Sequence, residues 1–139
     1  MSERKKTIFL IDDEASVRRA IRKNLRSLNH RILEAENYEQ AMAIVKDGHP
    51  QVDMLLIDIS LPGKNGFMIA EALREIYPNL KMLFMSAPVG AEWTRYQGVP
   101  VTDVHFLPKP FGAAELLERV QYVLAWRAPL SAGGAGSAF

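Results

Sequence analysis

Five side chains of the kinds that bind metal ions and phosphoryl groups sit at the ends of apolar runs in this 139-residue sequence. Asp12 and Asp13 follow the first run, Asp58 ends the third, Ser86 ends the fourth, and Lys109 follows the fifth. If the runs are parallel strands, their carboxyl ends meet at one edge of a sheet. Three carboxylates, one hydroxyl group and one ammonium group would then converge on that edge.

The chemistry of such a group follows from its charges. Carboxylates packed together repel one another, and they cannot all stay ionised without a compensating cation. Mg²⁺ is a hard ion that takes oxygen ligands and needs only a few carboxylates. With Mg²⁺ bound, an aspartate can attack phosphorus, because the metal and a lysine neutralise the charge that spreads over the phosphoryl oxygens. A flavin-phosphate site would instead need hydroxyls and bare amides after the first strand, so the acidic residues there exclude it.

The elements that must position these residues alternate between strand and helix along the chain. Apolar runs predict strands over residues 7–11, 31–34, 52–57, 80–85 and 104–107. Five amphipathic stretches predict helices. Asn37 caps one of them with Gln40 at its third position, another is a poor helix over 91–97, and the last ends near Trp126. Short connections favour an α/β fold, a doubly wound, flavodoxin-like (βα)5 sheet of five parallel strands in the order 2-1-3-4-5.

The composition of the chain argues against several classes of function. The chain has no cysteine, which excludes disulfides, thiolate zinc sites and a cysteine nucleophile. Neither a membrane span nor a signal peptide is visible, so we expect a cytoplasmic protein without a membrane partner. The net charge of +1 gives no basic excess for nucleic-acid binding. One basic cluster is interpreted as the solvated face of the first helix; its members are Arg18, Arg19, Arg22, Lys23 and Arg26.

The length fits one globular domain, which we place at residues 1–127. Residues 128–139 are rich in glycine, alanine and serine and cannot build a core, so we expect a flexible tail or linker there. Too little sequence follows Trp126 for an effector domain. We therefore expect either a stand-alone domain or one domain of a larger protein.

Four motifs in a fixed order resemble the receiver domain of response regulators, and the resemblance spans about residues 6–126. The motifs are IDDE at 11–14, LLIDISLPGKNGF at 55–67, FMSAP at 84–88 and FLPKPF at 106–111. The resemblance implies a protein of two-component phosphorelay signalling whose partner is a histidine kinase or a histidine phosphotransfer protein. Such a domain is no enzyme beyond its own phosphorylation and dephosphorylation. We expect a monomer or weak dimer, within a response regulator, a hybrid histidine kinase or alone.

The same resemblance assigns roles to the residues at the strand ends. Asp58 corresponds to the phospho-acceptor, and Asp12 and Asp13 to the acidic pair that binds Mg²⁺ beside it. The backbone carbonyl of Ser60 corresponds to a further metal ligand. Lys109 corresponds to the family's lysine that contacts the phosphoryl group.

Two positions are implied to change on phosphorylation. Ser86 corresponds to a hydroxyl that moves onto a phosphoryl oxygen. Phe106 stands at an aromatic switch position where many relatives have tyrosine, so switching there would depend on packing without a hydrogen bond. The bond from Lys109 to Pro110 is expected to be cis.

Two other functions stay open. A phosphorylation-independent scaffold that binds other proteins would keep the acidic edge without using it. An aspartyl-phosphate hydrolase of the haloacid-dehalogenase sort also uses aspartate and Mg²⁺. That class needs a second aspartate two positions after the nucleophile, where this chain has Ser60.

Overall fold

The computed structural model describes residues 5–86 and 105–126. Five parallel strands form one sheet in the order β2-β1-β3-β4-β5, which confirms the predicted fold. The strands are β1 (Thr7–Ile11), β2 (Arg31–Ala35), β3 (Met54–Asp58), β4 (Lys81–Ser86) and β5 (His105–Pro108). The helices are α1 (Ala15–Leu25) with a 3₁₀ turn at Arg26–Leu28, α2 (Tyr38–Lys46), α3 (Gly66–Ile76) and α4 (Ala113–Ala125). The predicted helix over 91–97 and the predicted tail lie outside the described residues.

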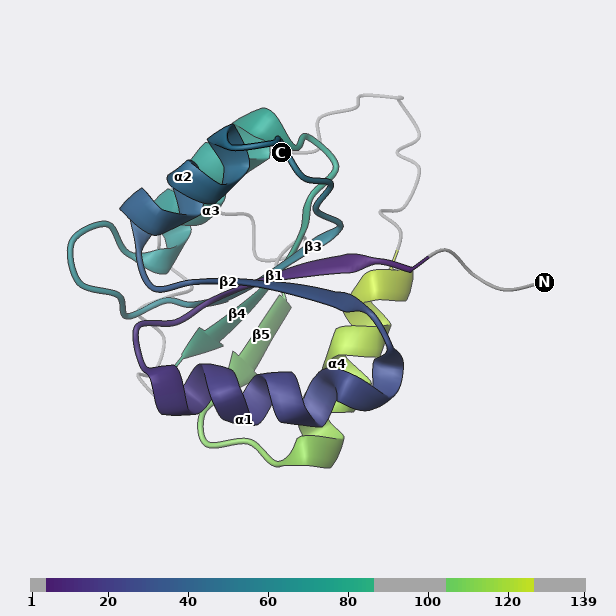
Figure 1. The fold of residues 1–139 in the computed structure, drawn as a ribbon. Coiled ribbons are helices and arrows are strands. Elements are labelled where there is room, and N and C mark those ends of the chain that lie inside the picture. The colour runs from purple at the N-terminus through teal and green to yellow at the C-terminus, as the bar shows by residue number, and fades with distance from the viewer. Residues whose placement is uncertain (1–4, 87–104, 127–139) are drawn as a thin grey trace, which may run out of the picture.

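The sheet is covered on both faces, with α2 and α3 on one side and α1 and α4 on the other (Figure 1). Each face has its own apolar cluster, because side chains along a strand alternate between the two faces. On β1, Phe9 and Ile11 belong to the α2–α3 side, whereas Ile8 and Leu10 belong to the α1–α4 side. The two central strands β1 and β3 are buried along their whole length, which explains why they appear in the sequence as continuous apolar runs.

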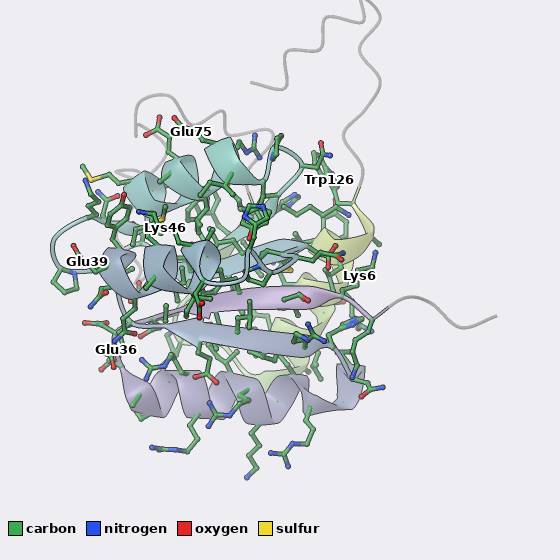
Figure 2. All side chains as sticks on the ribbon, turned by 45° about the horizontal axis from the view of Figure 1, so that its top comes forward. Lys6, Glu36, Glu39, Lys46, Glu75 and Trp126 are labelled. Carbon is green, nitrogen blue, oxygen red and sulfur yellow. The ribbon has the colours of Figure 1, made fainter. Side chains whose placement is uncertain are left out.

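The register of the strands brings their ends to one level. Ile11 pairs with Ile57 across β1 and β3, and Asp58 pairs with Met85 across β3 and β4. Residues that follow β1 and β3 therefore emerge side by side at the carboxyl edge of the sheet, where the strands end. Figure 2 shows this polarity: Lys6 and Trp126 lie at one end of the strands, and Glu36 lies at the other.

Asparagine side chains begin two of the helices. Asn37 Oδ1 accepts a hydrogen bond from the amide of Gln40 at 2.9 Å, as predicted. The Gln40 side chain in turn accepts from the amide of Glu36 at 2.9 Å. Asn65 Oδ1 accepts from the amide of Met68 at 3.0 Å and begins α3 next to the end of β3. These caps satisfy amides that have no partner within the helix.

No helix in the described part of the chain is long and apolar enough to cross a bilayer.

Candidate functional site

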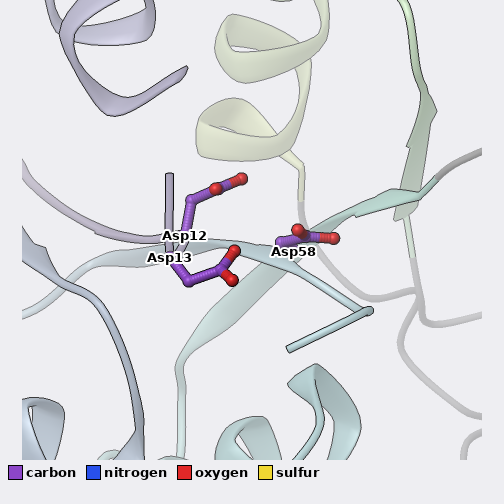
Figure 3. Close-up of side chains that lie close together, drawn as sticks. All are labelled: Asp12, Asp13 and Asp58. Atoms are coloured by element: carbon purple, nitrogen blue, oxygen red, sulfur yellow. The ribbon is translucent and has the colours of Figure 1, made fainter. Parts of the chain in front are cut away.

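Three aspartates meet at the carboxyl edge of the sheet. One carboxylate oxygen from each of Asp12, Asp13 and Asp58 lies within 4.8 Å of the others. Figure 3 shows the first two just beyond β1 and the third at the end of β3. Asp12 is fully buried, Asp58 is 6% exposed, and Asp13 is exposed. The cluster is thus buried on one side and open to solvent on the other.

Asp12 is held from several directions. Its amide donates to the carbonyl oxygen of Ala35 at 3.2 Å, which ties it to the end of β2. Its Oδ1 accepts from the amide of Glu14 at 2.9 Å, and its Oδ2 lies 3.2 Å from Lys109 Nζ. Burial raises the pKa of Asp12 above its usual value of 3.8; the amide of Glu14 and the charge of Lys109 oppose this rise. Removing water disfavours the ionised form, so this carboxylate favours a cation beside it.

The two carboxylate oxygens of Asp58 have different partners. Oδ1 accepts from the amide of Ser60 at 3.0 Å, and Oδ2 lies 3.4 Å from Lys109 Nζ. The chain behind Asp58 is in close contact with the first residue of α3. A Cβ atom on Gly66 would lie 2.4 Å from the carbonyl oxygen of Asp58 and 2.8 Å from Ile59 Cα. A residue without a side chain is therefore required at this position.

Lys109 follows β5 and reaches across the edge to both buried aspartates. Its amide donates to the carbonyl oxygen of Ser86 at 2.7 Å, which fixes the loop after β5 to the end of β4. The following bond to Pro110 is cis, as predicted. Burial alone would lower the pKa of Lys109, but the carboxylates of Asp12 and Asp58 outweigh it and raise this pKa above its usual value. Lys109 therefore carries a charge at neutral pH.

The remaining predicted residues surround this centre. Ser86 is buried, and its Oγ has no hydrogen-bond partner within residues 5–86 and 105–126. Phe106 is partly buried, with its ring centroid 5.8 Å from that of Phe84, which lies 4.7 Å from that of Phe67. This row of rings joins β5 and β4 to the start of α3. Ser60 is exposed in the loop after Asp58.

The donor set suits a hard divalent cation. All three clustered ligands are carboxylate oxygens, the type that Mg²⁺ and Ca²⁺ prefer. Three ionised carboxylates and one ammonium group would leave two uncompensated negative charges, which is the charge of one divalent ion. Asp12, Asp13 and Asp58 are the residues that could hold it.

Two residues at this edge were not predicted from the sequence. Gly66 lies within the motif at 55–67 and was given no role of its own, although a glycine between a strand-end aspartate and a helix is a signal for close packing. Arg18 was interpreted as part of a solvated basic face, and this interpretation is wrong for Arg18. Its side chain is only 14% exposed and contacts both Glu34 and the backbone of Asp12. The interpretation holds for Arg19 and Lys23, which are exposed on α1.

The chain is similar in sequence to transcriptional regulators. Residues 8–121 match the family described as response regulator receiver domain. Phosphate regulon transcriptional regulatory protein PhoB of Pseudomonas aeruginosa is 35% identical over 137 residues, covering 93% of this chain and 58% of the relative. Transcriptional regulatory protein ResD of Bacillus subtilis is 33% identical over 117 residues, covering 84% of this chain and 47% of the relative. The chain thus spans roughly half the length of these two relatives.

Solved structures agree with these matches. A response regulator receiver protein from Sinorhizobium medicae is 30% identical with a TM-score of 0.75, covering 88% of this chain and 97% of that one. The receiver domain of the hybrid histidine kinase CckA is also 30% identical, with a TM-score of 0.68, covering 85% of this chain and 98% of that one. Since the family match covers nearly all of the described strands and helices and the fold agrees, this chain belongs to the response regulator receiver domains of two-component signalling.

Proposed function

We propose that this chain accepts a phosphoryl group on Asp58, next to a Mg²⁺ ion held by Asp12, Asp13 and Asp58 and by the carbonyl oxygen of Ser60. The observation that carries the proposal is the position of Asp58. It ends a buried strand, one of its oxygens is held by the Ser60 amide, and the other faces Lys109 and the acidic cluster. A carboxylate so placed has one oxygen fixed by the backbone and the other beside the ammonium group that would neutralise a phosphoryl group.

In the transfer, a carboxylate oxygen of Asp58 attacks phosphorus and forms a new P–O bond. The bond from phosphorus to the donor breaks, and the donor leaves with its electron pair. Lys109, 3.4 Å from Asp58 Oδ2, would donate to a phosphoryl oxygen as negative charge spreads over that group. When bound, Mg²⁺ would supply further neutralisation of the charge on the transferring phosphoryl group.

The change of state would follow from the buried hydroxyl of Ser86. This hydroxyl lies at the end of β4, the strand next to β3, and a phosphoryl oxygen on Asp58 would offer it an acceptor. Movement of Ser86 would shift the end of β4 and the row of rings from Phe84 to Phe106. The result would be an equilibrium between two conformations, which differ in the packing of Phe106 and which phosphorylation of Asp58 would shift.

The donor would be the phosphohistidine of a histidine kinase or a histidine phosphotransfer protein. The relatives named above are transcriptional regulatory proteins, and one structural relative is part of a hybrid kinase. Either arrangement of the whole protein fits a receiver domain. The hydrolase alternative is disfavoured because position 60, two after Asp58, is serine and not aspartate.

The test is to incubate the chain with acetyl phosphate and Mg²⁺ and measure its intact mass. We expect one added phosphoryl group on the wild type, and none on Asp58→Asn or without a divalent ion. Addition to Asp58→Asn would place the acceptor elsewhere. No addition to the wild type under any condition would contradict the proposal and favour a phosphorylation-independent scaffold. Catalytic turnover of a phosphomonoester would instead favour the hydrolase.

A further inference from the structure

The backbone between the two adjacent aspartates is contacted by an arginine from the next helix. Arg18 lies in the first turn of α1, and its Nη1 donates to the carbonyl oxygen of Asp12 at 2.6 Å. That oxygen belongs to the peptide joining Asp12 to Asp13. The plane of this peptide sets the directions in which the two aspartate side chains leave the backbone. Arg18 thus contacts the backbone from which both side chains leave.

The guanidinium is itself fixed from the other side by β2. Arg18 Nε donates to Glu34 Oε1 at 3.2 Å, and Nη2 lies 4.0 Å from Glu36 Oε2. The other oxygen of Glu34 is paired with Arg22. A planar guanidinium with donors on two edges can bind the carbonyl and the carboxylate together, which a lysine ammonium cannot do in the same geometry.

Burial makes this contact effective. The Arg18 side chain is 14% exposed and that of Glu34 is 24% exposed, so water competes weakly for their hydrogen bonds. Arg18 and Arg22 face Glu34 and Glu36, so the charges of these four side chains largely cancel. The influence of Arg18 on the acidic cluster is therefore exerted by geometry more than by its positive charge.

We propose that Arg18 is a positioning residue for the divalent-cation site, orienting the Asp12–Asp13 peptide so that both carboxylates face Asp58. This inference rests on the proposed function, because it concerns the affinity of that site for a divalent ion. Loss of groups that orient metal ligands costs roughly 10-fold or more in metal affinity. Charge alone predicts the opposite sign, because removing a nearby positive charge strengthens the binding of a cation.

The probe is Mn²⁺, whose free concentration is measured by electron paramagnetic resonance during titration of the full chain. We expect Arg18→Ala to weaken Mn²⁺ binding by roughly 10-fold. The matched control is Arg19→Ala, which removes the same charge from an exposed position of the same helix. This control should bind Mn²⁺ as tightly as the wild type or slightly more tightly. Arg18→Lys keeps the charge, and its affinity for Mn²⁺ should lie between that of Arg18→Ala and that of the wild type.

The outcomes separate the two proposals. If the wild type binds Mn²⁺ and Arg18→Ala binds it equally well or better, the positioning role is overturned and the metal site stands. If the wild type binds no Mn²⁺, both are overturned. Circular dichroism establishes whether each variant is folded before titration. Should Arg18→Ala not fold, Arg18→Lys decides: weaker binding than the wild type supports the positioning role, and equal binding overturns it.

Discussion

Asp53, just before β3, and Asp58, at the end of β3, have different environments. Their positions at opposite ends of the strand explain the difference. Asp53 precedes the strand, and its Oδ2 accepts from the amide of Thr7 at 2.8 Å at the amino edge of the sheet. Asp58 ends the strand at the carboxyl edge and joins the acidic cluster. The sequence itself requires this separation, because five residues of extended chain span roughly 16 Å. It did not predict that Asp12 is fully buried while its neighbour Asp13 is exposed.

At the residue scale, Gly66 tests the packing behind Asp58. We expect Gly66→Ser to lower the free energy of unfolding by about 1–3 kcal/mol, because its Cβ would meet backbone atoms that cannot move aside freely. The matched control is Gly112→Ser at the start of α4, where a Cβ meets nothing within 4 Å. That control should stay within about 0.5 kcal/mol of the wild type in urea unfolding. Equal changes in unfolding free energy for the two variants would show that the backbone around Gly66 moves aside for a Cβ atom without loss of stability.

At the element scale, the sequence predicted which segments form strands better than it predicted where each strand begins and ends. The buried central strands were found because both of their faces are apolar. The predicted start of the third strand at residue 52 was two residues early. Val52 is apolar and buried, but Asp53 separates it from Met54, the first residue of β3. Arg18 was misassigned because its partner Glu34 lies 16 residues away on another element. Periodicity within one helix carries no information about such a partner.

The cap of α3 leads to a prediction at this scale. Asn65→Ala and Asn37→Ala each remove a side-chain acceptor from a helix start, and each should cost about 1 kcal/mol of unfolding free energy. Only Asn65 begins the helix whose first residue contacts the backbone of Asp58. We therefore expect Asn65→Ala alone to slow phosphorylation by acetyl phosphate. Equal rates for the two variants at matched temperature would mean that the start of α3 does not position Asp58.

At the scale of the whole molecule, the site exists only when the sheet is complete. Lys109 and Asp12 are 97 residues apart in the sequence and 3.2 Å apart in the fold. The sequence predicted that they would meet because strand order and the carboxyl-edge rule together fix which residues converge. Burial and hydrogen bonding at that edge depend on side chains from several elements, so they could be learned only from the structure.

The buried acidic cluster also couples global stability to pH and to divalent ions. Burial raises the pKa of Asp12, so the folded protein keeps this proton to a higher pH than the unfolded chain does. The contribution of that proton to stability is complete at low pH and is lost as pH rises through the folded pKa. Without metal, the unfolding free energy of the wild type should therefore fall as pH rises above about 4, relative to that of Asp12→Asn, whose side chain cannot ionise. Urea unfolding in EDTA measures this difference. Added Mg²⁺ should restore stability at pH 8 in the wild type and much less in Asp12→Asn, because the ion binds the folded state through the ionised carboxylates. A constant difference across this pH range would mean that Asp12 titrates alike in the folded and unfolded chain.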